Sequence, residues 1–152
     1  MIKDPDNPIT RQSPLTTQEI ILAYSLGAFP MGENKTSKKI EWVLPLKRGL
    51  IPIGEIHCSK RLKKLIKKNE FFVSFDQSFT QVISNCAKRK ITWINQTIFD
   101  QFLKLHSEGL AHSVEIIKDN KLVGGLYGLS LGSIFFAESM FSIIPNASKL
   151  AM

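Results

Sequence analysis

The chain has 152 residues, of which 43% are hydrophobic and 22% charged, so it can bury one sizeable core in one ordinary domain. This composition excludes collagen-like, low-complexity and wholly disordered proteins. The formal net charge of +7 indicates a polyanionic partner and says little about the fold.

No segment reads as a targeting or membrane-spanning element. Residues 1–15 are rich in proline and lack the apolar core and cleavage site of a secretory signal, so we expect an extended leader there. No uncharged apolar run approaches the roughly 20 residues that a membrane-spanning helix needs. We therefore expect a soluble, cytoplasmic protein. Cys58 and Cys86 have no Cys or His partners at metal-binding spacing, which predicts two reduced thiols and no metal site.

The first predicted element is a helix from Thr16 to Leu26. Thr16 and Glu19 form a capping-box pattern, and Gly27 follows the last apolar position. A turn, a polar loop and short extended pieces broken by prolines are predicted over residues 29–32, 33–39 and 40–53.

A strongly basic helix is predicted next, with Ser59 as its cap. Leu62, Leu65 and Ile66 fall on one stripe at about 100° per residue, and cations cover the remaining surface. These cations are Lys60, Arg61, Lys63, Lys64, Lys67 and Lys68. A merely solvated face is the alternative, but no acid intervenes and a second basic cluster follows at residues 88–90. We therefore favour a phosphate-contacting surface, and the lack of interleaved aromatics favours duplex backbone or an acceptor stem over a single strand.

The middle of the chain is predicted to contain one strand and two helices. They cover residues 71–75, 79–87 and 96–107. Asp76 or Ser78 can cap the first of these helices, and Gly109 can end the second. His106 and His112 flank that glycine, and as lone histidines they are assigned no chemistry.

Three strands in an antiparallel meander are predicted after residue 111. They cover residues 112–118, 121–131 and 134–141, with Asp119-Asn120 and Gly132-Ser133 as turns. A meander that follows helices predicts an α+β fold class. Glycines 124, 125 and 128 lie inside the second strand and do not open a helix, so they do not form a dinucleotide fingerprint. They predict a bulge or a close approach of the backbone, as in a substrate groove.

Glu138 stands out in the third strand, because a carboxylate and two hydroxyls lie there among three phenylalanines and a methionine. An isolated charge in apolar surroundings costs several kcal/mol unless it is paired or its pKa shifts, so a functional role is one interpretation of this residue. The alternative is strand alternation with Glu138 on a wet face. Asn146 or Ser148 can then cap a last helix, of which about one turn is present.

An ordered set of motifs runs from about Glu19 to the last residue. It consists of Ala23-Tyr24, Gly27-Ala28-Phe29-Pro30, Thr92-Trp93-Ile94, Leu105-His106-Ser107-Glu108-Gly109, Ala111-His112-Ser113-Val114-Glu115, Leu122-Val123-Gly124-Gly125-Leu126-Tyr127-Gly128, Glu138-Ser139-Met140-Phe141-Ser142 and Asn146-Ala147-Ser148-Lys149. In order and spacing, these motifs resemble the bacterial leucyl/phenylalanyl-tRNA-protein transferase family.

The resemblance implies an enzyme that takes Leu, Phe or Met from its aminoacyl-tRNA and joins it to the N-terminal Arg or Lys of a protein, which marks that protein for the N-end rule degradation pathway. It implies a small N-terminal α/β part over residues 16–75 that binds tRNA, and a GNAT-type acyltransferase domain over residues 76–152 that is incomplete at its C-terminus. The resemblance also implies a monomer. No cofactor is expected, because joining an activated ester to an amine requires orientation of the two groups and a proton acceptor.

The resemblance also implies roles for single residues. Glu138 matches the motif's glutamate, and we expect it to act in catalysis by holding an amino group. The expected wall of the aminoacyl pocket consists of Trp93, Leu126, Phe135, Ala137, Met140 and Met31. Ala137 replaces a common Gly and can narrow the pocket, whereas Met31 replaces a common Trp with a more flexible apolar side chain. The basic helix coincides with the family's tRNA-binding surface.

Family members continue past the Asn-Ala-Ser-Lys motif with a helix and a strand that carries an Asp-Cys-Gln motif associated with catalysis. The printed sequence ends at Met152 without them. We therefore expect an N-terminal two-thirds fragment or a split or decayed gene product. The alternatives are an inactive tRNA-binding remnant and an unstable fragment with an open sheet edge.

Overall fold

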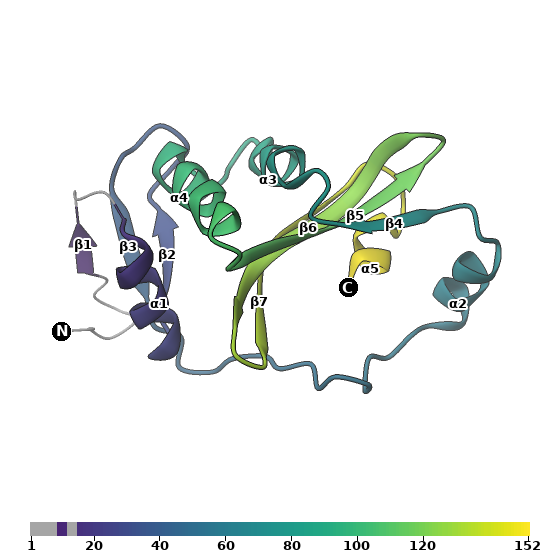
Figure 1. Cartoon of the computed structure of the whole chain (residues 1–152), viewed down its shortest axis with the longest axis horizontal. Coiled ribbons are helices and arrows are strands. Elements are labelled where there is room, and N and C mark those ends of the chain that lie inside the picture. The colour runs from purple at the N-terminus through teal and green to yellow at the C-terminus, as the bar shows by residue number, and fades with distance from the viewer. Residues whose placement is uncertain (1–8, 12–14) are drawn as a thin grey trace.

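Two antiparallel sheets and five helices form the fold in a computed structural model that describes residues 9–11 and 15–152 (Figure 1). The strands are β1 (Ile9–Arg11), β2 (Phe29–Gly32), β3 (Ile40–Val43), β4 (Phe72–Phe75), β5 (Ala111–Lys118), β6 (Lys121–Leu131) and β7 (Ile134–Ser142). The helices are α1 (Thr17–Ser25), α2 (Lys60–Lys67), α3 (Phe79–Ala87), α4 (Gln96–Ser107) and α5 (Ala147–Ala151). The predicted α+β class is confirmed. None of the described helices is long and apolar enough to cross a membrane.

The N-terminal part packs α1 beside a sheet of order β1-β3-β2. The predicted capping box is confirmed: the Thr16 hydroxyl accepts from the Glu19 amide, and the Glu19 carboxylate accepts from the Thr16 amide at 3.1 Å. The predicted turn over residues 29–32 is wrong, because this segment is strand β2 paired with β3. Pro30 is tolerated because β2 lies at an edge of the sheet. Of the leader predicted over residues 1–15, residues 9–11 form β1, and residues 1–8 and 12–14 lie outside the described residues.

The larger sheet has the order β4-β5-β6-β7, and all its neighbouring strands are antiparallel. The predicted meander is confirmed. Asp119 and Asn120 both have positive φ, of 50° and 58°, as a tight hairpin turn between right-twisted strands requires. Helices α3 and α4 have the predicted bounds and cover one face of this sheet, while α5 packs on the other face (Figure 1).

The two faces of the larger sheet bury different cores. Tyr127, Leu129 and Phe141 belong to the main core with α1, α3 and α4. Ile116 and Leu126 belong to a smaller core that includes α5. A Cβ on Gly124 would lie 2.5 Å from the Cβ of Ala147 in α5, so this glycine permits the close approach. Packing on the sheet stabilises α5, whose five residues would not form a helix alone.

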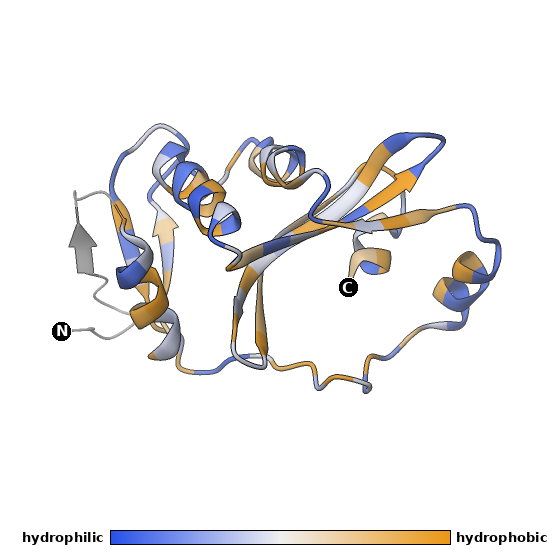
Figure 2. Cartoon of the chain, viewed as in Figure 1, coloured by the Kyte–Doolittle hydropathy of each residue, from blue (hydrophilic) through white to orange (hydrophobic). Residues whose placement is uncertain are grey.

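A long segment over residues 44–59 contains no helix or strand and leads to α2, which Figure 1 places at the far end of the molecule from the N-terminal sheet. Ser59 caps α2 as predicted, since its hydroxyl accepts from the Leu62 amide at 3.2 Å. Figure 2 shows both apolar and polar residues on α2, yet none is buried, and Ile66 is 55% exposed. The predicted apolar stripe therefore does not form part of either core.

Candidate functional site

Glu138 lies at a β-bulge in strand β7. Tyr127 pairs with Ser139 and Gly128 pairs with Ala137, so Glu138 is the extra residue without a partner on β6. The glycines of β6 predicted a bulge in that strand, and β6 has one at Val123, whereas the bulge at Glu138 lies in β7. Bulges redirect a side chain relative to simple alternation. Here the bulge places Glu138 on the face of the sheet that carries the main core, near Tyr24 and Tyr127.

Two buried tyrosine hydroxyls accompany the Glu138 carboxyl. Tyr24 from α1 is 2% exposed, and Tyr127 from β6 is fully buried. Neither hydroxyl has a hydrogen-bond partner of good geometry among the described residues. Phe136 packs edge-on against Tyr24 with ring centroids 5.1 Å apart, which closes one side of this cluster. Two buried hydroxyls beside a carboxyl form a site that can bind a polar group of a ligand.

Burial sets the protonation of this cluster. It raises the pKa of Glu138 to about 7, while the neighbouring Tyr24 hydroxyl and the positive charge of Arg48 act in the opposite direction. Burial and the charge of Glu138 raise the pKa of both tyrosine hydroxyls well above its ordinary value, so both remain hydrogen-bond donors at neutral pH. Glu138 is about half ionised near pH 7, which suits a group that binds an amine or exchanges a proton.

Two predicted pocket residues lie on the N-terminal side of the molecule. The Trp93 carbonyl accepts from the Gly32 amide at 3.0 Å, and a Cβ on Gly32 would lie 2.5 Å from that oxygen. Trp93 is partly buried against the main core, which also contains Tyr24. Met31 is the half-buried neighbour of Gly32 on β2. The close contact of β2 with Trp93 therefore holds both residues in the part of the molecule that contains α1.

The other predicted pocket residues lie on the opposite face of the β6–β7 hairpin. Leu126 pairs with Met140, and both belong to the small core with α5. The Phe135 ring covers Gly128, with its Cζ 2.6 Å from where a Cβ would stand, and Ala137 pairs with the same glycine. The structure thus divides the predicted site between the two faces of β7. Sequence alternation could not show this division, because the bulge shifts the register at Glu138.

The five cations of the basic helix α2 and Lys68 at its C-cap are all exposed. Lys68 lies 3.8 Å from Glu70, and the helix contacts α5. The second basic cluster, at residues 88–90, differs from α2 because one of its cations makes a contact within the fold. The Arg89 guanidinium donates to the carbonyl of Met140 at 2.6 Å and so connects the end of α3 to β7. The structure therefore presents α2 as the exposed basic surface, and Arg89 as a residue that also packs the fold.

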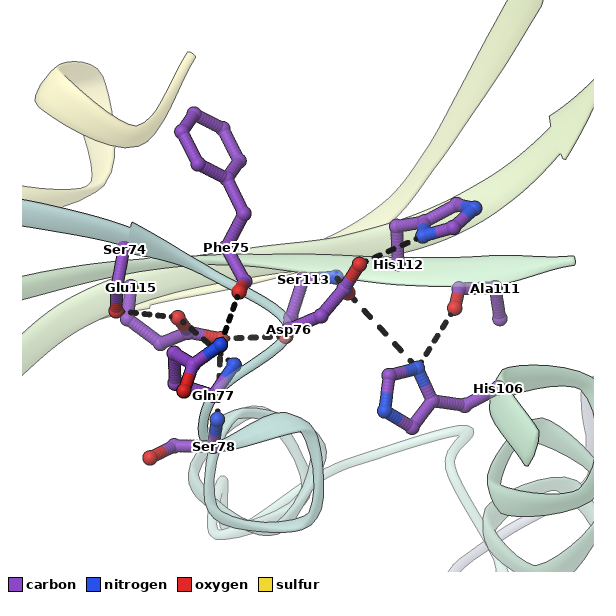
Figure 3. A network of polar contacts seen from close by, with 10 residues as sticks. All are labelled: Ser74, Phe75, Asp76, Gln77, Ser78, His106, Ala111, His112, Ser113 and Glu115. Atoms are coloured by element: carbon purple, nitrogen blue, oxygen red, sulfur yellow. Dashed lines mark hydrogen bonds and ion pairs between the residues drawn. The ribbon is translucent and has the colours of Figure 1, made fainter. Parts of the chain in front are cut away.

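A polar network at the start of α3 was not predicted from the sequence (Figure 3). Glu115 is fully buried and accepts from the hydroxyls of Ser74 and Ser113 at 2.6 and 2.5 Å. It also accepts from the backbone amides of Gln77 and Ser78 at 3.4 Å. Ser78 occupies the predicted N-cap position of α3, but its side chain makes no capping bond, and Glu115 accepts from the amides of Gln77 and Ser78. Ala111, Ser113 and Glu115 alternate along β5 and therefore lie on one face of the strand. Because Ala111 is buried, this alternation was the signal in the sequence that Glu115 faces inward.

Asp76 joins the two histidines that flank Gly109 (Figure 3). Its carboxylate lies 2.8 Å from His112 Nδ1 and 3.8 Å from His106 Nδ1, and it accepts from the Ser113 amide. Burial opposes the ionised form, but the His112 and Ser113 hydrogen bonds prevail and lower the pKa of Asp76. His106 also stacks on Phe79 at 4.1 Å. These contacts connect β4, α4 and β5 and give both histidines partners within the fold.

Comparison with known proteins identifies the family. The family model described as leucyl/phenylalanyl-tRNA protein transferase matches residues 50–152. The leucyl/phenylalanyl-tRNA–protein transferase of Dinoroseobacter shibae is 41% identical over 138 residues, which are 91% of this chain and 62% of that relative. Those of Ruegeria sp. and Cereibacter sphaeroides are 42% and 44% identical over 91% of this chain and 66% and 64% of their own length. The chain therefore spans slightly less than two thirds of these relatives. The resemblance of the sequence motifs to this family is confirmed, and this chain belongs to the leucyl/phenylalanyl-tRNA protein transferase family.

Proposed function

We propose that this chain acts in the transfer of Leu, Phe or Met from aminoacyl-tRNA to the N-terminal Arg or Lys of proteins, as a cytoplasmic monomer in the N-end rule pathway. Family membership supports the reaction. The observation that carries the proposal is the Glu138 carboxyl, which a bulge directs toward the buried hydroxyls of Tyr24 and Tyr127.

The proposed role of Glu138 is to hold an amino group at the reaction centre. In this reaction the amine nitrogen forms a bond to the ester carbonyl carbon, the bond from that carbon to the tRNA ribose oxygen breaks, and one proton passes from the amine to the departing oxygen. A buried carboxylate regains through an ammonium partner part of the solvation that it lost. Tyr24 and Tyr127 can donate to the same carboxyl and fix its orientation.

The proposed aminoacyl pocket has two walls. Leu126, Phe135 and Met140 supply apolar surface on the α5 side, with Ala137 beside Gly128. Trp93, packed against the main core, and Met31, half-buried on β2, supply it on the other side. Because β7 is an edge strand among the described residues, a substrate that contacts both walls must pass around this edge. An apolar pocket discriminates by about 1 to 3 kcal/mol per methylene, which fits acceptance of several apolar amino acids.

The proposed tRNA-binding surface is helix α2, whose cations are exposed. In this arrangement residues 16–75 contribute the tRNA-binding part, and residues 76–152 form part of a GNAT-type domain. The antiparallel meander with a bulged strand is the feature that supports this second assignment.

The test of transfer uses the full chain, phenylalanyl-tRNA with labelled Phe, and a peptide that begins with Arg. We expect labelled peptide with the unchanged chain and at least a tenfold loss with Glu138→Gln, since an uncharged amide holds an ammonium poorly. Glu55→Gln, in the exposed segment before α2, is the control and should transfer normally.

If the chain binds tRNA but transfers no Phe, the proposal is replaced by the alternative of an inactive tRNA-binding remnant. Binding is tested with the α2 triple variant, in which Lys63, Lys64 and Lys67 become Ala. Each phosphate contact contributes close to one unit to the slope of log affinity against log salt, so the slope should fall by about two to three.

A further inference from the structure

Arg48 is fixed at three points although it lies in the irregular segment over residues 44–59. Its Nη2 donates to the Gly27 carbonyl at 2.8 Å. Its guanidinium carbon lies 5.1 Å from the ring centroid of Phe29 and 5.5 Å from that of Phe136. These distances are in the range of cation–π contacts. One exposed side chain therefore connects the end of α1, strand β2 and strand β7.

These contacts lead directly to the Glu138 site. Phe136 is two residues before Glu138 and packs edge-on against Tyr24, whose hydroxyl neighbours the Glu138 carboxyl. Three groups face Glu138: Tyr24 from α1, Tyr127 from β6 and Arg48 from the 44–59 segment. Among the described residues, Arg48 is the cation whose charge acts on this carboxyl.

We propose that Arg48 is a positioning residue for the Glu138 site, because it fixes β7 against the N-terminal part and supplies the positive field in which the carboxylate works. The inference rests on the proposed role of Glu138 and extends it to a residue outside the pocket. Arginine suits this position because its planar group stacks on two rings while an N–H donates to a carbonyl. Lysine would keep the charge and lose this combined geometry.

Two variants separate the charge of Arg48 from its shape. Arg48→Met removes the charge, and Arg48→Lys retains it. The primary measurement is the titration of the Glu138 side-chain carboxyl carbon by NMR in the full chain, which does not depend on activity. We expect Arg48→Met to raise the Glu138 midpoint by about one unit or less, because removal of a nearby cation disfavours the carboxylate. Lys47→Met is the matched control and should leave the midpoint unchanged, since Lys47 is exposed and is not among the groups that shift the pKa of Glu138.

The second measurement is the set of ring contacts of Phe136. We expect Arg48→Lys to weaken the cross-peaks between the Phe136 ring and Tyr24 and to lower transfer at all pH values. If Arg48→Met does not fold, the Arg48→Lys spectra decide the question. An unchanged midpoint in folded Arg48→Met, or unchanged ring contacts in Arg48→Lys, would overturn the inference. Normal transfer by Glu138→Gln would instead overturn the proposed role of Glu138, so the two failures are distinguishable.

Discussion

Glu138→Gln should stabilise the fold at alkaline pH while it impairs function. Burial raises the pKa of Glu138 from its ordinary 4.5 to about 7. Between these two values the folded state binds the proton that the unfolded state has released. The free energy of unfolding therefore falls as pH rises through this window, and the loss is complete above about pH 7.

The magnitude follows from the size of the pKa shift. Each pKa unit corresponds to about 1.4 kcal/mol of unfolding free energy, so a difference of about two and a half units gives about 3 kcal/mol. Partial exposure of Glu138 to solvent reduces this contribution to about 2 kcal/mol. Glutamine has the shape of glutamate and carries no charge. We expect Glu138→Gln to raise the free energy of unfolding by about 2 kcal/mol near pH 8 and by almost nothing near pH 4.

Urea denaturation of both proteins at the two pH values measures this difference, provided that unfolding is two-state. Glu55→Gln, an exposed carboxylate, is the control and should change stability at neither pH. Equal stability of Glu138→Gln and the unchanged chain near pH 8, or a lower stability of the variant there, would refute the conclusion that a charge is buried at this position.

Three further predictions concern the sheet, the α3 network and the basic helix. Gly128→Ala should lower the free energy of unfolding by about 1 to 3 kcal/mol, because a Cβ would meet the Phe136 carbonyl and the Phe135 ring. Gly49 has open space around it, so the control Gly49→Ala should have little effect in the same denaturation experiment. Glu115→Gln should cost about 1 to 3 kcal/mol, since the amide cannot accept from four donors, and unchanged stability would contradict the network. The α2 triple variant should weaken tRNA binding with a flatter salt dependence in filter binding, and an unchanged slope would exclude α2 as the phosphate-contacting surface.

The sequence predicted best where short-range signals act alone. The capping box of Thr16 and Glu19, the Ser59 cap and the apolar periods of α3 and α4 fix those helices through contacts within one or two turns. Strand β2 was missed because Phe29-Pro30-Met31-Gly32 resembles a turn locally, and pairing with β3 overrides that preference.

The candidate site was predicted less completely, because its geometry depends on distant segments. The family motifs indicated Glu138, but neither the bulge at this residue nor the approach of Tyr24 is visible in local alternation. The role of Arg48 was hidden for the same reason, since its partners Gly27 and Phe136 are far apart in the sequence. Residues that act through tertiary contacts need the fold before their function can be recognised.

The most direct test of the account is the titration of Glu138 by carbon NMR with and without an aminoacyl probe. The probe is the phenylalanyl amide of 3′-amino-3′-deoxyadenosine, and its control is the 3-phenylpropanoyl amide, which lacks the amino group. We predict a midpoint of about 7 in the free chain that falls when the amino probe binds and stays constant with the control. A free midpoint near the ordinary value of 4.5, or equal responses to both compounds, would contradict the proposal that Glu138 holds an amino group.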